Sequence, residues 1–258
     1  MADPKTREWS AAHREAEGYY SVRDADEAFF RKQAAGPVVS TILAIGRAQG
    51  RPLRILEIGC GSGADSVCLA LAGHDVTTLD VSDHLLEGAR QLAKTAARLF
   101  PDRPLQLRFV QGDIFDLEEY AGQYDVVLSF DVTVIWPEEA KRLAALANLR
   151  AALKEEGWLL YGTTNTANPL FKLVPVRSIV ADLAVHSLAI LEHEVRATGL
   201  RVIGRGALGL SEHFEQWLAS PLLGAPLRVA NWVFERLPRR LQLLVAPHVF
   251  VVARLPGR

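Results

Sequence analysis

Three glycines follow an acidic residue in the stretch "RILEIGCGSGAD", which covers residues 54–65. Glu57 lies in the apolar run, and Gly59, Gly61 and Gly63 then alternate with other small residues. A strand that passes through glycines into a helix presents free backbone N–H groups together with the positive end of the helix dipole. The stretch therefore predicts a turn that binds a polar ligand.

Spacing alone leaves two interpretations of this turn open. Gly59, Gly61 and Ala64 also satisfy the loose dinucleotide-binding pattern G-x-G-x-x-G/A, and Asp80 follows at about the twenty residues that this pattern requires. Glu57 separates the two interpretations, because a carboxylate that faces the turn repels a pyrophosphate and attracts an ammonium group. We therefore expect the end of the ligand nearest the glycines to be cationic or zwitterionic.

Two further carboxylates follow the next two apolar runs. Asp80 closes "DVTTLD", where two acceptor oxygens suit the two hydroxyls of a ribose. Asp113 in "VQGDIFD" lies next to that position and suits an exocyclic amine such as adenine N6, with Asp116 as the alternative in the same stretch. In chain order, the three carboxylates predict sites for an amino acid, a ribose and an adenine.

The elements that must position these residues alternate short β-rich runs with longer helical stretches. The predicted strands cover 53–58, 75–80, 105–111, 124–130, 158–163, 201–206 and 247–254. The predicted helices cover 63–72, 83–98, 138–155 and 179–198, with Pro137 in a first turn and Gly73, Gly157 and Gly199 as stops. Such alternation forms parallel crossovers with helices on both faces, so the predicted fold is a doubly wound α/β sheet.

Together these motifs resemble the class I (Rossmann-like) S-adenosylmethionine-dependent methyltransferases. The matching positions are Glu57, Gly59, Gly61 and Gly63 as E-x-G-x-G-x-G, Asp80 at the second strand end, and Gly112, Asp113 and Ile114 as G-D-I. The resemblance implies a seven-stranded, mostly parallel sheet with an antiparallel last strand, which we expect at "HVFVVARL". It implies S-adenosyl-L-methionine as cofactor and S-adenosyl-L-homocysteine as product, and the predicted cofactor contacts also include Val81, Phe130 and Tyr20.

The acceptor side is expected after the fourth strand, in "SFDVTVIWPEE". Methyl transfer from a sulfonium is an in-line displacement, so a general base is needed only for an acceptor that is protonated at neutral pH. The candidates for catalysis are Asp131, His213 and His248, and Trp136 is a further candidate for acceptor contact. Related families that methylate amide or nucleobase amines resemble one another in an N/D-P-P-Y/F element here, and its absence disfavours DNA adenine and protein glutamine.

Two regions depart from the strand–helix alternation. Residues 1–50 are predicted to be a helical lead-in that acts as a lid, with Tyr19 and Tyr20 in "EGYYS" as its aromatic contacts; 51–258 are the cofactor-binding domain. Residues 207–246 are predicted to be a helical cover inserted before the last strand. Its apolar residues, which include Phe214, Trp217 and Leu218, lie near several arginines, so pocket cover, cover with membrane contact and simple packing are all open.

Composition excludes several classes of protein. The 258 residues carry a net charge of −1 with a pI near 6.7, which disfavours a surface that grips nucleic acid. No apolar run approaches the roughly 20 residues of a membrane span, and the charged N-terminus has no secretory pattern. We expect a cytoplasmic protein without a metal, in which Cys60 and Cys68 are reduced and buried.

The sequence therefore predicts a metal-independent methyltransferase that acts on a small, apolar or aromatic molecule, with oxygen favoured over nitrogen or carbon as the acceptor atom. Three alternatives are weighed against it. One is an oxidoreductase that binds NAD or NADP at the same turn, and another is a peripheral membrane or partner-binding protein that retains the cofactor fold. The third is an RNA methyltransferase, which the overall charge disfavours.

Overall fold

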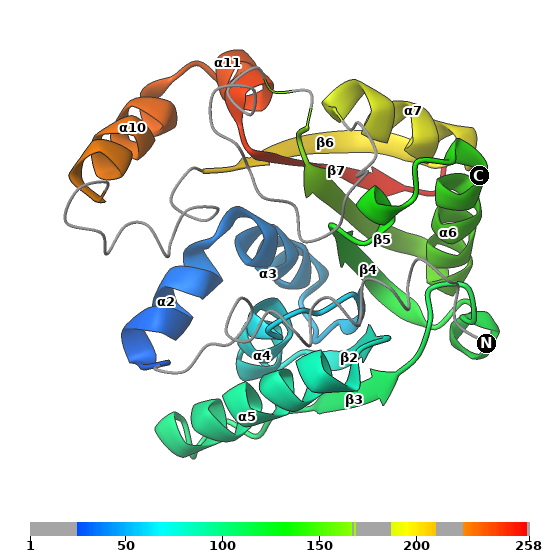
Figure 1. Cartoon of the computed structure of the whole chain (residues 1–258). Helices are drawn as coiled ribbons and strands as arrows, with labels where there is room; N and C mark the ends of the chain where they lie inside the picture. Colours follow the sequence, from blue (N-terminus) through cyan, green and yellow to red (C-terminus); the bar gives the residue numbers. More distant parts are fainter. Residues whose placement is uncertain (1–24, 167, 169–186, 210–223, 257–258) are drawn as a thin grey trace.

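A computed structural model describes residues 25–166, 168, 187–209 and 224–256, with the backbone alone at 224 and 226–228. Its strands form one seven-stranded sheet in the order β3-β2-β1-β4-β5-β7-β6 (Figure 1). The strands are β1 (Arg54–Ile58), β2 (Asp75–Asp80), β3 (Leu107–Gln111), β4 (Tyr124–Phe130), β5 (Leu153–Thr164), β6 (Arg201–Leu208) and β7 (His248–Arg254). Only β7 runs antiparallel to its neighbours, which confirms the predicted fold.

Helices cover both faces of the sheet (Figure 1). One face carries α3 (Pro37–Gln49), α4 (Ala64–Leu71) and α5 (Asp83–Leu99), with α2 (Glu27–Ala35) against α4. The other face carries α6 (Glu139–Ala152) and α7 (Leu188–Ala197). Three-residue 3₁₀ turns, η1 (Glu118–Tyr120) and η2 (Thr133–Ile135), flank β4. Because β4 has helices on both sides, its residues are buried in near-continuous succession.

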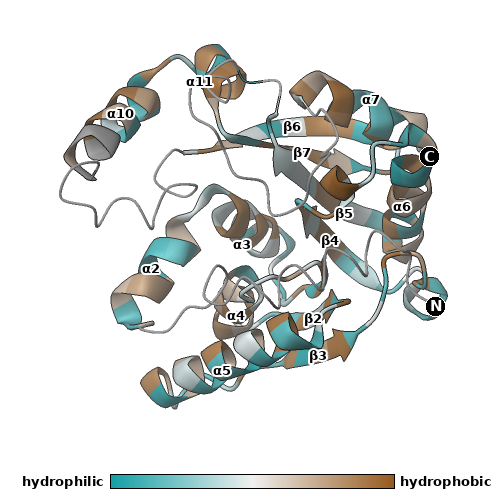
Figure 2. Ribbon diagram, in the orientation of Figure 1, coloured by the Kyte–Doolittle hydropathy of each residue, from teal (hydrophilic) through white to brown (hydrophobic). Residues whose placement is uncertain are grey.

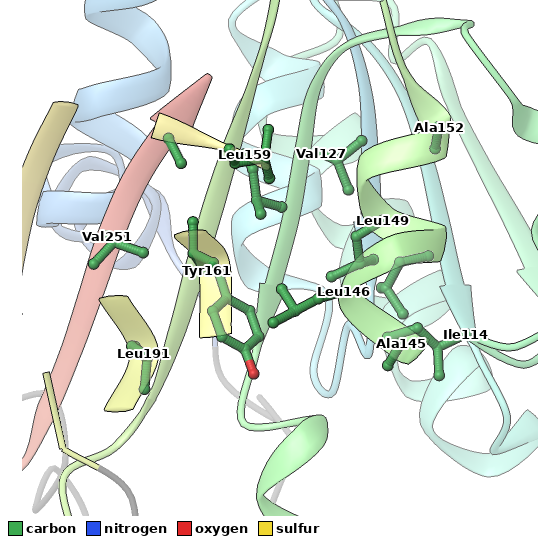
Figure 3. Packing of buried hydrophobic residues seen from close by; sticks show 14 of the residues in the cluster. Ile114, Val127, Ala145, Leu146, Leu149, Ala152, Leu159, Tyr161, Leu191 and Val251 are labelled. Atoms are coloured by element: carbon green, nitrogen blue, oxygen red, sulfur yellow. The ribbon is translucent and has the colours of Figure 1, made fainter. Parts of the chain in front are cut away.

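Each helix contributes one apolar side to these layers. Figure 2 shows hydrophilic and hydrophobic residues alternating along α5, whose buried residues include Leu85, Leu92 and Ala96. On the opposite face, Leu146 and Leu149 of α6 pack beside Tyr161 of β5 (Figure 3). The sheet is therefore packed between two apolar layers.

A buried ion pair stabilises the turn that follows β4. Arg142 of α6 lies 2.7 Å from Glu194 of α7, measured from Nε to Oε1, and the Glu194 side chain is fully buried. The same guanidinium donates to the backbone carbonyls of Trp136 (2.8 Å) and Pro137 (2.7 Å). The pair therefore anchors the segment in which the acceptor side was predicted.

Most predicted element ends agree with the structure. Gly73 and Gly199 follow α4 and α7 with φ of 90° and 82°, and the Ser82 hydroxyl caps α5 by accepting from Leu85 N. Gly157 was predicted to end a helix, and this is wrong. The helix ends at Ala152, and Gly157 lies inside β5, where a Cβ would come within 3.1 Å of the Tyr124 carbonyl oxygen.

The two regions that depart from the strand–helix alternation are mainly helical where the structure describes them, but Ala207 and Leu208, predicted to begin the cover, belong to β6. The lead-in contains α2 and α3, and the segment before β7 contains α10 (Gly224–Arg236) and α11 (Arg239–Val245). Phe234 packs into the core, whereas its neighbour Val233 is 46% exposed. Phe214, Trp217 and Leu218 lie outside the described residues. None of the described helices is long and apolar enough to cross a membrane.

Candidate functional site

The turn after β1 adopts a conformation that requires glycine. Gly59, Gly61 and Gly63 have φ values of 75°, 51° and 74°, in the left-handed region. A Cβ on Gly59 would lie 2.2 Å from Val132 Cγ2, and one on Gly63 would lie 2.5 Å from Ala89 Cβ. The turn is therefore packed against both neighbours while its backbone is open toward the end of the sheet.

A cavity of about 240 Å³ opens where this turn meets the carboxyl ends of the neighbouring parallel strands. Glu57, the glycine turn, Asp80 and Asp113 all line it, so the structure brings together the residues that sequence spacing predicted. The predicted cofactor contacts Val81, Ile114 and Phe130 also line it. Their common position follows from parallel strands ending at the same edge of the sheet.

The cavity lining is strongly acidic. Among the described residues, five carboxylates line it and no lysine or arginine does; the five are Glu57, Asp65, Asp80, Asp113 and Asp131. A pyrophosphate in such surroundings would meet uncompensated negative charge, whereas a sulfonium and an ammonium group would be attracted. The lining therefore fits S-adenosylmethionine and does not fit a dinucleotide.

Glu57 is a strongly perturbed carboxylate of this cavity. It is 6% exposed and accepts a short hydrogen bond from the Ser66 hydroxyl. Burial, followed by the charges of Asp65 and Asp80, raises the pKa of Glu57 to about 8, although the Ser66 hydrogen bond opposes this. Without a cation nearby, the side chain therefore holds a proton at neutral pH.

Asp80 faces the cavity from the end of β2. Its carboxylate accepts from Ser82 N at 2.9 Å and from Gly61 N at 3.4 Å, which fixes it beside the glycine turn. Burial raises the pKa of Asp80 to about 6, against the lowering effect of these backbone hydrogen bonds. A rigid, buried acceptor pair at this position suits a ligand that brings two hydroxyl donors.

The choice left open between Asp113 and Asp116 is resolved by burial. Asp113 is 6% exposed, lines the cavity, and accepts from Phe115 N at 3.2 Å. Asp116 is exposed and does not line the cavity. The aspartate of the G-D-I motif is therefore the one that faces the cavity.

Asp131 and His248 form a pair at the mouth of the cavity. His248 Nε2 lies 3.1 Å from Asp131 Oδ2, and the Thr164 hydroxyl donates to Asp131 Oδ1 at 2.9 Å. Burial raises the pKa of Asp131, but the charge and hydrogen bond of His248 and the bonds from Thr164 outweigh it and hold the pKa below its ordinary value. Asp131 lines the cavity, and His248 lies behind it.

The backbone at Asp131 is in an uncommon conformation. Its φ of 54° is the only positive value at a non-glycine residue in the described part of the chain. The Asp131 amide donates to the Gly162 carbonyl at 3.1 Å, which helps to hold this geometry. Aspartate tolerates the left-handed region better than most residues, and such conformations concentrate at functional sites.

Some predicted residues lie outside the described part of the chain, and one residue that lines the cavity was missed. Tyr19, Tyr20 and His213 lie outside the described residues. Trp136 lines the cavity and is 1% exposed.

Asp65 was not predicted, because an acidic residue in a first helical turn is ordinarily explained by the helix dipole. Its position two residues after the last glycine of the turn was the available signal.

Metal ligands do not gather in the part of the chain that the structure describes. No group of three or more histidine, cysteine, aspartate and glutamate side chains there has a metal-binding arrangement. Cys60 and Cys68 are both unpaired by disulfides and buried. Burial raises the pKa of the Cys68 thiol to about 12, so this side chain is a neutral thiol.

An acidic cavity at the glycine turn of a doubly wound sheet suits a cationic nucleoside ligand, and comparisons with known proteins point to the same class of protein. A family model described as a methyltransferase domain matches residues 55–157. Magnesium-protoporphyrin O-methyltransferase of Synechocystis is 30% identical over 169 residues, which are 58% of this chain and 70% of that protein. Ubiquinone biosynthesis O-methyltransferase of Bordetella avium is 31% identical over 172 residues, 63% of either chain, so the match spans less than two thirds of that relative.

Solved structures show the same fold. Magnesium protoporphyrin IX methyltransferase from Synechocystis, crystallised with S-adenosylhomocysteine, superposes with a TM-score of 0.61 at 19% identity, over 98% of this chain and 100% of that one. The N-methyltransferase NodS from Bradyrhizobium japonicum gives 0.59 at 16% identity, over 99% and 100%. This chain belongs to the class I S-adenosylmethionine-dependent methyltransferases. Crystal structures of these neighbours contain S-adenosylmethionine or S-adenosylhomocysteine.

Proposed function

We propose that this methyltransferase transfers the methyl group of S-adenosylmethionine to a hydroxyl oxygen of a small, apolar or aromatic molecule. The observation that carries this proposal is the Asp131–His248 pair beside the cofactor cavity. Two sequence relatives whose names specify O-methyl transfer support the same acceptor atom. A hydroxyl must lose its proton during methylation, and a carboxylate with a histidine behind it provides a place for that proton.

The cofactor-binding roles follow from the cavity. We propose that Glu57 binds the ammonium group, with its proton leaving as the cation arrives, and that Asp80 accepts from the two ribose hydroxyls. Asp113 and the backbone at Ile114 then lie beside the adenine. The bound cofactor supplies a methyl group that its sulfonium has already activated, so the protein mainly needs to orient the acceptor and exclude water.

On the acceptor side, Asp131 is the residue with the right charge and access. Its pKa lies below the ordinary value, so it is a carboxylate at neutral pH and accepts a hydrogen bond from the acceptor hydroxyl. Asp131 takes up the proton that the hydroxyl releases, and His248 Nε2, 3.1 Å away, donates to the carboxylate and holds it in place. Trp136, Ile135 and Val132 give the neighbouring wall an apolar surface, which suits an apolar or aromatic acceptor.

The lead-in belongs to the same proposal as a lid over the cofactor. Its described part already contacts the site: Gln33 Nε2 of α2 donates to Asp65 Oδ1 at 2.5 Å, and Asp65 lines the cavity. Of the segment before β7, none of the residues described at 224–246 lines this cavity. The predicted cover function of 207–246 therefore stays a prediction.

A cytoplasmic location is also part of this proposal. Two free, buried cysteines support it, because reduced thiols are typical of that compartment.

Matched acceptors test the proposed reaction. Small molecules that copurify with the protein are identified by mass spectrometry, and turnover is then measured with isotope-labelled methyl donor on each of them. Aromatic acceptors that differ only in a hydroxyl or an amino group are compared in parallel. The proposal predicts that the label enters the hydroxyl compound, and methylation confined to the amino compound would contradict it.

A further inference from the structure

Helix α10 carries apolar residues on two sides, and the part of the chain that the structure describes covers only one of them. Phe234 is 7% exposed and packs into the core. Val229, Trp232 and Val233 are 62%, 55% and 46% exposed. Their spacing of three and four residues places them on one side of the helix, which is an unusual amount of apolar surface to leave in water.

Helix α11 also carries exposed apolar residues. Leu241 and Leu244 are 46% and 60% exposed, whereas Val245 packs against the core. The Gln242 side-chain amide donates to the backbone carbonyls of Phe234 and Glu235, each at 3.1 Å, which ties α11 to the end of α10. Figure 1 places both helices at one extremity of the molecule, away from α5 and β3.

Most of the charged side chains described on these two helices are positive. Arg236, Arg239 and Arg240 are exposed there with one acidic residue, Glu235, in a chain whose net charge is −1. The Arg236 guanidinium stacks 4.0 Å from the centre of the Trp232 ring. The surface is therefore locally basic as well as apolar, against the overall charge of the protein.

We infer that α10 and α11 form a docking face for an anionic membrane surface. The exposed tryptophan and aliphatic side chains enter the interface between headgroups and acyl chains, while the arginines bind lipid phosphates. Side chains that have an apolar part and a polar end are favoured at this depth, because the apolar part is buried while the polar end contacts headgroups. Trp232 beside Arg236 is such an arrangement. A second copy of the chain fits this face less well, because the arginines of the two copies would repel one another.

The docking face lies close to the catalytic edge of the sheet. Asn165, just after β5, donates to the Ala246 carbonyl at 3.1 Å, directly after α11. His248 begins β7 two residues later and contacts Asp131 in the cavity. The membrane contact and the methyl-transfer site are therefore joined through one short segment, so an acceptor dissolved in the membrane would have a short path to the cavity.

Vesicle cosedimentation tests this inference directly. The full chain is mixed with vesicles of phosphatidylcholine alone or with about one third phosphatidylglycerol, at low and high salt. We expect binding to the anionic vesicles, loss of binding at high salt, and about a fivefold loss for each arginine neutralised. The variant R236Q/R240Q should thus bind about 25-fold more weakly, and Trp232→Ser should also weaken binding.

Matched substitutions elsewhere serve as controls. Arg103 stacks on Phe100 at 5.6 Å much as Arg236 stacks on Trp232, and Ile203 is an exposed apolar residue of β6. Arg103→Gln and Ile203→Ser should leave vesicle binding unchanged. Circular dichroism and S-adenosylhomocysteine affinity verify that every variant is folded. Absence of binding to anionic vesicles, or equal loss in the control variants, would overturn the inference, as would concentration-dependent dimerisation abolished by Trp232→Ser.

Discussion

His248 Nε2 and Asp131 Oδ2 lie 3.1 Å apart, although one residue begins β7 and the other follows β4. They meet because β7 is antiparallel: its first residue pairs with Thr164, the last residue of β5, at the edge where the parallel strands end. The antiparallel strand thus brings a histidine to the same edge as the cofactor turn. This contact connects the fold to the proposed proton transfer.

Removing the charge of Asp131 should slow methyl transfer without weakening cofactor binding. We expect Asp131→Asn to lower kcat about 100-fold, the lower end of the range for general-base contributions. In the wild type the rate should fall toward acid pH as the pair takes up a proton, and the variant should lose this dependence. Thr164→Val, which removes one hydrogen bond to the carboxylate, is the milder control. An unchanged kcat and pH profile in Asp131→Asn would show that the pair has no part in catalysis.

Glu57→Gln should stabilise the ligand-free protein at alkaline pH. The folded-state pKa of Glu57 is raised from 4.5 to about 8, so its contribution to stability is complete below about 4.5 and is lost as the pH rises through 8. Glutamine cannot ionise and escapes this loss, which we expect to amount to about 1–3 kcal/mol at pH 9. Thermal unfolding of the wild type and of Glu57→Gln at pH 5 and pH 9 measures this loss. A difference in stability between the two proteins that is the same at both pH values would refute the raised pKa of Glu57.

The same residue links cofactor binding to pH. Because the S-adenosylmethionine ammonium group favours ionised Glu57, binding should release a proton, and affinity should increase with pH up to about 8. In Glu57→Gln the affinity should fall about tenfold, as expected for one charge-assisted hydrogen bond. Its dependence on pH in this range should also decrease. Titration calorimetry in buffers of different ionisation enthalpy reports both effects.

The buried Arg142–Glu194 pair should be costly to break on one side only. Arg142→Leu leaves Glu194 buried without its partner and releases the Trp136 and Pro137 carbonyls, so we expect a loss of about 3–5 kcal/mol in the free energy of unfolding. R142L/E194L should recover much of this loss. Arg31→Leu removes an exposed ion pair with Glu27 and should cost under about 1 kcal/mol. Urea unfolding distinguishes these cases, and a double variant no more stable than Arg142→Leu would contradict the account.

Cofactor should protect the lead-in from proteolysis if this segment closes over the site. Gln33 already contacts Asp65 at the cavity, so ordering of the lead-in and of the bound cofactor should be coupled. S-adenosylhomocysteine should then slow cleavage between about residues 10 and 35, since cleavage requires local opening. Cleavage in a site-free control region, the exposed turn near Arg103, should not change. Equal rates with and without ligand would mean that the lead-in is not a lid.

The strand ends and their carboxylates could be predicted because they depend on local patterns. Glu57, Asp80 and Asp113 each follow or end an apolar run, and parallel strands necessarily end at one edge. The pairing of Asp131 with His248 depends instead on the register of an antiparallel strand, which no local pattern specifies. Gly157 was misassigned for a similar reason: a helix stop and a strand irregularity both favour glycine.

The central claim is that this acidic cavity binds S-adenosylmethionine, and calorimetry with four ligands tests it most directly. S-adenosylmethionine and S-adenosylhomocysteine should bind with micromolar dissociation constants, about 8 kcal/mol of binding free energy, and NAD and NADP should give no heat of binding. Asp80→Ala should weaken both sulfur ligands by roughly 1.5–3 kcal/mol. Tight binding of NAD or NADP without binding of either sulfur ligand would contradict the account.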